Sequence, residues 1–130
     1  MIFDTDIFIW VQRGNEKAAK LMENTEHRYL SIQTYMELLQ GAKDKTQHKY
    51  VKSFITSYNF MVLPFTENIG HRASIYIEEY TLSSNLRSGD AIIAATAVEN
   101  NMILVSSNVK HFKVIKDLKL KAFKPYSREM

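Results

Sequence analysis

The sequence predicts an α/β fold with a central parallel sheet of four to five strands flanked by helices. Short apolar runs alternate along the chain with longer segments of helical periodicity. This alternation is typical of parallel strands joined by crossover helices. The length of 130 residues suits one domain, which we expect to span residues 1–130. No repeat, low-complexity tract or linker divides the sequence.

The first half of the chain supplies two of the expected strands. A buried strand is predicted over residues 1–3, and a helix over residues 7–22 that a glycine interrupts near its middle. A second strand is expected over residues 29–31. The next helix starts at a cap near Ser31 and ends near Gly41, because serine accepts hydrogen bonds from first-turn amides and glycine favours a helix end.

The second half repeats the alternation of helices and strands. Helices are expected over residues 46–58, 66–82 and 90–99. Strands are expected over residues 60–63, 102–105 and 120–123. Proline cannot donate a hydrogen bond to a sheet, so Pro64 ends the first of these strands. The segment over residues 91–98 is apolar nearly all round, which predicts a buried helix.

Composition excludes several classes of protein. There is no cysteine, so disulfides and thiolate metal sites are excluded, and we expect a cytoplasmic protein. No targeting signal is visible, and no stretch approaches the ~20 apolar residues of a membrane helix, so no membrane partner is expected. The formal net charge of +3 is compatible with nucleic-acid binding.

Polar residues follow the predicted strands at the positions where a ligand site is expected. Ligands of open α/β sheets bind beyond the carboxyl ends of the strands. Asp4 and Asp6 follow the first strand, and Ser106, Ser107 and Asn108 follow the strand that ends at residue 105. The sequence therefore predicts a polar site at this edge of the sheet.

Two aspartates, Asp4 and Asp90, each have two interpretations. Each stands at the start of a predicted helix, where an aspartate caps the first amides and favours the helix dipole. Each also lies where a metal ligand is expected. The sequence alone leaves both roles open.

Glu37 is the third carboxylate of interest. The helix that carries it has an apolar face formed by Ile32, Tyr35, Met36 and Leu39. Glu37 falls on the opposite face, so by itself it is a solvated glutamate unless that face turns toward an acidic groove. Three carboxylates together match the oxygen ligands of Mg²⁺, and such a site can activate water against a phosphodiester.

Other catalytic motifs are absent from the sequence. No HExxH, GxGxxG or P-loop motif occurs, and no motif supports Ser–His–Asp chemistry. The histidines, which show no mutual pairing at helical spacing, are assigned to structural or surface roles: His27, His48, His71 and His111.

Four segments, in order along nearly the whole chain, resemble the motifs of PIN-domain toxins of the VapC type. The opening Ile2-Phe3-Asp4-Thr5-Asp6 resembles a strand that runs into Asp, Thr and then Asn or Asp. The second, third and fourth motifs are matched by Ser31-x-x-Thr34-x-x-Glu37-Leu38-x-x-Gly41, by Gly89-Asp90-Ala91-Ile92-Ile93-Ala94-Ala95 and by Val105-Ser106-Ser107-Asn108-Val109-Lys110-His111-Phe112.

The resemblance implies a PIN-like fold and an endoribonuclease that depends on Mg²⁺ or Mn²⁺. Asp4, Glu37 and Asp90 match the three central acidic positions. The fourth position is often Asp in this family, and Asn108 is its closest match here. An asparagine can ligate a metal through its carbonyl oxygen but contributes no charge, which weakens the case for a second ion.

Supporting roles are also implied by the resemblance. Asp6 would act as an outer partner of the metal ligands or contribute directly. Thr5 and Ser106 would orient carboxylates or water, although both also suit turn caps. A metal-activated water would attack the phosphodiester in line and leave 5′-phosphate and 3′-hydroxyl ends.

Basic residues suggest how RNA would bind. Arg87 lies shortly before Asp90, and Lys110 and Lys113 belong to a lysine-rich C-terminal third. Cations of this kind hold phosphates and make binding depend on salt. The alternative is a solvated basic surface, which the sequence does not exclude.

Protein partners are also implied by the resemblance, which predicts a homodimer and a small antitoxin that blocks the acidic groove. Tyr50, Phe54 and Tyr58 recur at i, i+4 and i+8. Such a row forms either a partner-binding face or part of the core, and the sequence does not choose between them.

Two rival functions come from other classes. Asp4-Thr5-Asp6 also resembles the start of haloacid-dehalogenase-like phosphatases, but no second acid lies near Asp90 to complete their later motif. A catalytically degenerate module that binds RNA or a partner is favoured by Asn108 and opposed by the three carboxylates.

Overall fold

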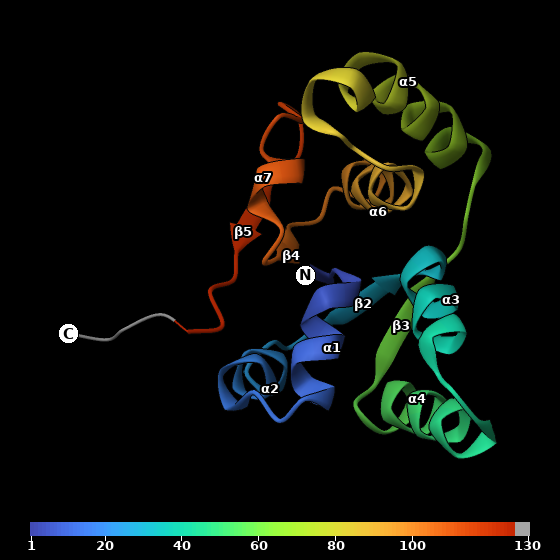
Figure 1. Cartoon of the computed structure of the whole chain (residues 1–130), viewed down its shortest axis with the longest axis vertical. Coiled ribbons are helices and arrows are strands. Elements are labelled where there is room, and N and C mark those ends of the chain that lie inside the picture. Colours follow the sequence, from blue (N-terminus) through green and yellow to red (C-terminus); the bar gives the residue numbers. More distant parts are fainter. Residues whose placement is uncertain (127–130) are drawn as a thin grey trace.

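The computed structural model describes residues 1–126. Within these residues the sheet has five strands, and every strand pairing is parallel. Figure 1 shows how the strands lie among the helices. In spatial order the strands are β3 (Phe60–Leu63), β2 (Arg28–Ser31), β1 (Ile2–Phe3), β4 (Leu104–Ser106) and β5 (Leu120–Ala122). The predicted α/β class with a parallel sheet of four to five strands is confirmed.

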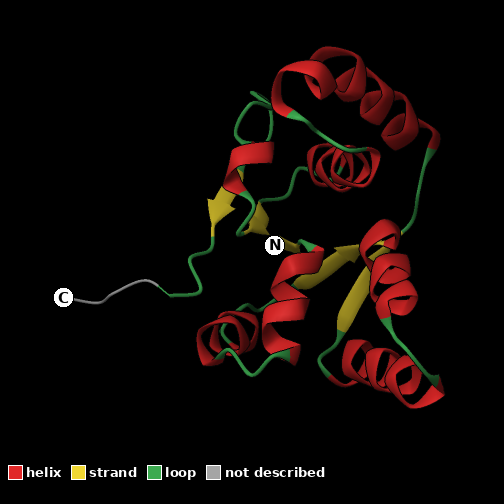
Figure 2. Ribbon diagram, in the orientation of Figure 1, coloured by secondary structure: helices red, strands yellow, loops and turns green. Residues whose placement is uncertain are grey.

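Helices connect the strands and cover the sheet (Figure 2). They are α1 (Thr5–Gln12), α2 (Glu16–Glu23), α3 (Ile32–Gly41), α4 (Lys45–Ser57), α5 (Glu67–Ser84), α6 (Ser88–Glu99) and α7 (Val109–Phe112). The short α7 was not predicted. Within residues 1–126, no helix is long and apolar enough to cross a membrane.

Two hydrophobic clusters lie on the two faces of the sheet. Successive side chains of a strand point to opposite faces. Ile2 of β1 lies opposite Leu104 of β4 and packs with α5, α6 and α7. Phe3 lies opposite Val105 and packs with α1, α2 and α4 on the other face. Figure 1 shows α5 and α6 on one side of the sheet and α1, α2 and α4 on the other.

The helix predicted over residues 7–22 is divided in two at Gly14. Gly14 has a φ of 84°, a left-handed conformation that glycine adopts without steric cost. Asn15 then caps α2 by accepting a hydrogen bond from the amide of Ala18 at 2.9 Å. The first half begins at Thr5, earlier than predicted, because Asp4 caps it.

The face that α3 buries differs from the predicted apolar face. Thr34 and Leu38 are the buried residues of this helix, whereas Met36 is 49% exposed. Burial of Thr34 costs little because its hydroxyl lies 3.0 Å from that of Thr5. The helix is therefore rotated relative to the prediction, and Glu37 turns away from bulk solvent.

The strand predicted over residues 102–105 lies later than expected, at Leu104–Ser106. Asn101 has a φ of 53°, and the amide of Met102, which was predicted to begin the strand, donates back to the carbonyl of Ala97 at the end of α6. Ser106 is consequently the last residue of β4 and is buried. This position directs its hydroxyl toward the end of the neighbouring strand β1.

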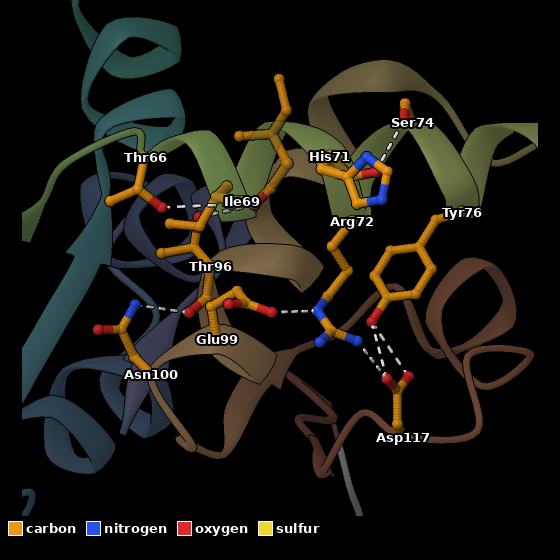
Figure 3. Close-up of polar contacts among 11 residues, drawn as sticks. Thr66, Ile69, His71, Arg72, Ser74, Tyr76, Thr96, Glu99, Asn100 and Asp117 are labelled. Atoms are coloured by element: carbon orange, nitrogen blue, oxygen red, sulfur yellow. Dashed lines mark hydrogen bonds and ion pairs between the residues drawn. The ribbon is translucent and has the colours of Figure 1, made fainter.

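A polar network ties α5 to the end of α6 and to the segment before β5 (Figure 3). Arg72 pairs with Glu99 and also with Asp117, at 2.9 Å from Oδ2. The hydroxyl of Tyr76 lies 3.0 and 3.2 Å from the two Asp117 carboxylate oxygens. Burial, with hydrogen bonding to Asp117, raises the pKa of Tyr76 to about 12, so its hydroxyl stays protonated at neutral pH.

Candidate active site

Asp4 lies at the carboxyl end of β1 and is only 5% exposed. As N-cap of α1, it accepts a hydrogen bond at Oδ1 from the amide of Thr5 at 2.8 Å. Its Oδ2 accepts a hydrogen bond from the hydroxyl of Ser106 at 2.7 Å. The capping interpretation of Asp4 is confirmed, and the same carboxylate is joined to the end of β4.

The negative charge of Asp4 is unfavourable in this environment. Burial raises the pKa of Asp4 well above its ordinary value, and the charge of Asp6 raises it further. The hydrogen bonds from Ser106 and Thr5 lower the pKa, and the charge of Asp90 raises it. An opposite charge nearby favours the ionised form of a carboxylate, so this group of acids would be stabilised by a cation.

Asp90 is the third residue of α6, so the prediction that it opens this helix is wrong by two residues. Burial raises the pKa of Asp90, whereas the backbone amide of Arg87, the N-cap, and the nearby His111 lower it. Nδ1 of His111 lies 3.6 Å from Oδ2 of Asp90. Asp90 thus lies in the first turn of a helix and also belongs to the acidic group, by which we mean Asp4, Asp6, Glu37 and Asp90.

Glu37 reaches the same group from α3 and is half-buried. Its Oε1 accepts a hydrogen bond from the hydroxyl of Thr5 at 2.6 Å, and its Oε2 accepts one from the side-chain amide of Gln33 at 2.9 Å. Burial is the main cause that raises the pKa of Asp90, and the charge of Glu37 adds to it. Glu37 is therefore close enough to the start of α6 for its charge to act on Asp90, and its functional role stays a prediction.

Asp6 is held by the residue that follows β4. The amide of Ser107 donates a hydrogen bond to Oδ2 of Asp6 at 3.0 Å, and the hydroxyl of Ser107 donates to the same oxygen. Oδ1 of Asp6 is buried and has no hydrogen-bond partner among residues 1–126. A buried carboxylate oxygen without a donor is costly unless water or a cation completes it.

Asn108 and His111 form the side of the site next to Asp90. The backbone amide of Asn108 donates a hydrogen bond to the hydroxyl of Ser106 at 2.9 Å. The side-chain Nδ2 of Asn108 lies 3.0 Å from Nδ1 of His111. The sequence assigned His111 to a structural or surface role, and its position beside Asn108 and Asp90 could not be foreseen, because the histidines were compared only with one another.

The three basic residues predicted to bind RNA are exposed and belong to segments that border the acidic group. Arg87 directly precedes α6, whose first turn carries Asp90. Lys110 belongs to α7, which Asn108 precedes, and Lys113 follows that helix. Their contact with RNA stays a prediction.

The donor set fits a divalent cation in chemistry and charge. Asp4, Asp6, Asp90 and Glu37 supply oxygen donors of the kind that Mg²⁺ and Mn²⁺ prefer. The charge of Asp6 and of Asp90 raises the pKa of Asp4, so these carboxylates repel one another in the absence of a cation. In the part of the chain that the structure describes, no three Asp, Glu or His side chains already converge as a metal cluster. Binding would therefore require side-chain adjustment.

A parallel sheet with carboxylates from separate elements at its carboxyl edge defines a small α/β protein with an acidic centre. The PIN domain model matches residues 1–118, and the chain belongs to this family. It is 32% identical over 126 residues to "Ribonuclease VapC1" of Rickettsia felis, covering 92% of this chain and 93% of that protein. It is 30% identical over 123 residues to "Ribonuclease VapC10" of Mycobacterium tuberculosis, covering 92% and 90%.

Solved structures of toxin–antitoxin complexes contain chains with the same fold as this one. A toxin–antitoxin complex from Klebsiella pneumoniae matches with a TM-score of 0.78 and 28% identity, covering 98% of each chain. VapBC-1 from nontypeable Haemophilus influenzae shares the fold, with a TM-score of 0.75, 22% identity and coverage of 94% and 98%. The predicted resemblance to VapC-type PIN domains is confirmed, and the phosphatase alternative is left without support.

Proposed function

We propose that this protein is a divalent-metal-dependent endoribonuclease and the toxin of a type II toxin–antitoxin pair. The proposal is supported by the electrostatic proximity of three carboxylates from different elements: the charge of Asp90 raises the pKa of Asp4, and the charge of Glu37 raises that of Asp90. Similarity to VapC ribonucleases over most of the chain supports the substrate class. We take residues 1–130 to act as one nuclease domain.

The metal ligands in this proposal are Asp4, Glu37 and Asp90, with the carbonyl oxygen of Asn108 as a fourth. When bound, Mg²⁺ or Mn²⁺ supplies an activated water and neutralises charge that develops on the phosphate. Ser106 and Thr5 orient the ligands, because their hydroxyls donate to Asp4 and Glu37.

The chemistry is hydrolysis of a phosphodiester. Water attacks phosphorus in line with the bond to the 3′ oxygen, and the products carry 5′-phosphate and 3′-hydroxyl ends. Arg87, Lys110 and Lys113 hold neighbouring phosphates, so RNA binding weakens as salt rises. Asp6, whose Oδ1 is buried without a donor, supports the site as an outer partner or a further ligand.

The antitoxin partner would occupy a groove that begins at Glu37. This groove has a volume of about 270 Å³. Its lining includes Glu37, two glutamines, Gln12 and Gln47, and apolar groups of Ile9, Leu38, Tyr50 and Val51. Tyr50 is 49% exposed, and its ring lies 6.1 Å from that of half-buried Phe54. An apolar peptide with a basic side chain would complement these surfaces and cover Glu37.

The predicted homodimer follows from the resemblance and stays a prediction. The cytoplasmic location stays one too, although an enzyme that cuts cellular RNA would work there.

The test is digestion of total RNA from the source cell by protein purified free of antitoxin. With Mn²⁺ we expect discrete cuts with 5′-phosphate ends, found by sequencing the new ends, and no cuts with EDTA. Cutting that persists in EDTA would contradict the proposal.

The alternative function, a catalytically degenerate binding module, predicts a different outcome when melting is measured beside cleavage. A folded protein whose melting temperature rises with Mn²⁺, but that cuts no RNA, would support that module instead.

A further inference from the structure

The carboxylate of Glu37 is held on both of its oxygens. Thr5 donates to Oε1, and Gln33, one turn earlier on α3, donates to Oε2 at 2.9 Å. We propose that Gln33 and Gly89 are positioning residues that hold Glu37 against the first turn of α6. This inference rests on the proposed function, in which Glu37 is a metal ligand.

Gln33 acts through its side-chain amide. It stands four residues before Glu37, a spacing that places two side chains on the same face of a helix. Gln33 and Glu37 are both half-buried. A charge-assisted hydrogen bond from an amide orients a carboxylate without adding charge to it. Gln33 therefore fixes Oε2 without competing with a cation for the negative charge of Glu37.

Gly89 acts through the space that its missing side chain leaves. A Cβ built at this position would lie 2.7 Å from Oε2 of Glu37 and 3.3 Å from Nε2 of Gln33. A separation of 2.7 Å is too short for a real Cβ, so the carboxylate, which is the far end of a flexible side chain, would have to move aside. Gly89 is the second residue of α6 and does not have a positive φ, so its backbone conformation does not require glycine. A side chain here would act by displacing Glu37.

Together the two residues determine where Glu37 stands relative to Asp90. Asp90 immediately follows Gly89, and the charge of Glu37 already raises the pKa of Asp90. Without the amide of Gln33, the Oε2 end of Glu37 is released. With a methyl group at position 89, Glu37 is pushed away from α6. Either change separates two of the proposed ligands.

The experiment measures the dissociation constant of Mn²⁺ for the intact chain by isothermal titration. The variants are Gln33→Met, which keeps the length of the side chain, and Gly89→Ala, each alone and combined with Glu37→Gln. Gln40→Met is the matched control, because Gln40 is an exposed glutamine of the same helix. Melting temperatures in EDTA check that each variant folds.

We expect Gln33→Met and Gly89→Ala each to weaken Mn²⁺ binding about tenfold, as loss of a group that orients a metal ligand commonly does. The control should bind as the native protein does. Neither substitution should weaken binding further when Glu37 is already glutamine, because both act through that carboxylate.

Two results would overturn the inference alone. One is native Mn²⁺ affinity in both single variants, while Glu37→Gln binds more weakly. The other is an equal loss in the presence and absence of the Glu37 carboxylate, which indicates a general structural role. Native protein that binds Mn²⁺ no more tightly than Glu37→Gln would overturn the inference and the proposed role of Glu37 together.

Discussion

The hydroxyl of Ser106 donates a hydrogen bond to Oδ2 of Asp4 at 2.7 Å and so joins residues 102 positions apart in sequence. It connects the carboxyl ends of β1 and β4, which pair in parallel. This hydrogen bond lowers the pKa of Asp4, in opposition to burial and to the charge of Asp6. Ser106 therefore favours the ionised form of this buried carboxylate.

Substitution Ser106→Ala should weaken Mn²⁺ binding most at acidic pH. Loss of the hydrogen bond raises the pKa of Asp4 further, so protons compete more strongly with the metal ion. We expect a loss of about tenfold at acidic pH and a smaller loss at alkaline pH. Titration of Mn²⁺ at several pH values measures this, with exposed Ser83→Ala as control. A loss of affinity that does not vary with pH would contradict the explanation.

The metal-free protein should become more stable when Asp4 is replaced by asparagine. The pKa of Asp4 is higher in the folded protein than in the unfolded chain. The protonated carboxyl therefore stabilises the fold below the unfolded pKa, and this stabilisation is lost as the pH rises through the folded pKa. At neutral pH the charge is therefore a cost, and Asp4→Asn removes it. We expect the melting temperature to rise by about 4 °C for each 1 kcal/mol that the substitution adds to the free energy of unfolding.

Melting temperatures measured in EDTA at two pH values test whether Asp4→Asn stabilises the metal-free protein. The difference between native protein and Asp4→Asn should shrink as the pH falls toward about 3, below the unfolded pKa, where the carboxylate is protonated in both states. A variant that is less stable than the native protein at neutral pH would show that the hydrogen bonds of Asp4 outweigh its desolvation.

The network of Arg72 should matter for stability and not for RNA cleavage. Glu99, which pairs with Arg72, is the last residue of α6, whereas Asp90 lies in its first turn. Tyr76→Phe removes the hydrogen bond to Asp117 and should cost about 1 kcal/mol. Arg72→Met should cost about 1–2 kcal/mol, because it leaves two carboxylates without their partner. Urea unfolding and cleavage assays measure the two effects separately.

Urea unfolding of the two variants and of their double variant tests whether these residues act together. The two losses should not add, since both substitutions affect Asp117. Strictly additive losses would show that Arg72 and Tyr76 stabilise the fold independently.

Much of the fold was predictable because its signals are local. Apolar runs bounded by polar residues located β1 and β3, and the serine and glycine at the ends of α3 located that helix. The division at Gly14 was also predicted. β4 was displaced because its start depends on the turn at Asn101, whose left-handed conformation no apolar pattern shows.

The candidate site was predictable in part. Asp4 and Asp90 could be found because they end a strand and start a buried helix. The orientation of Glu37 could not, since α3 buries Thr34, whose hydroxyl lies beside Thr5, while apolar Met36 is exposed. Contacts between distant residues decide such cases, and a helical pattern does not contain them.

The most direct test of the account compares cleavage of one RNA by the native protein and by Asp90→Asn, each with Mn²⁺. The substitution removes charge but keeps the size of the side chain. We predict that cleavage falls to the level of the EDTA control, while the melting temperature in EDTA is equal to or above that of the native protein. Undiminished cleavage by folded Asp90→Asn would contradict the claim that Asp4, Glu37 and Asp90 form the catalytic centre.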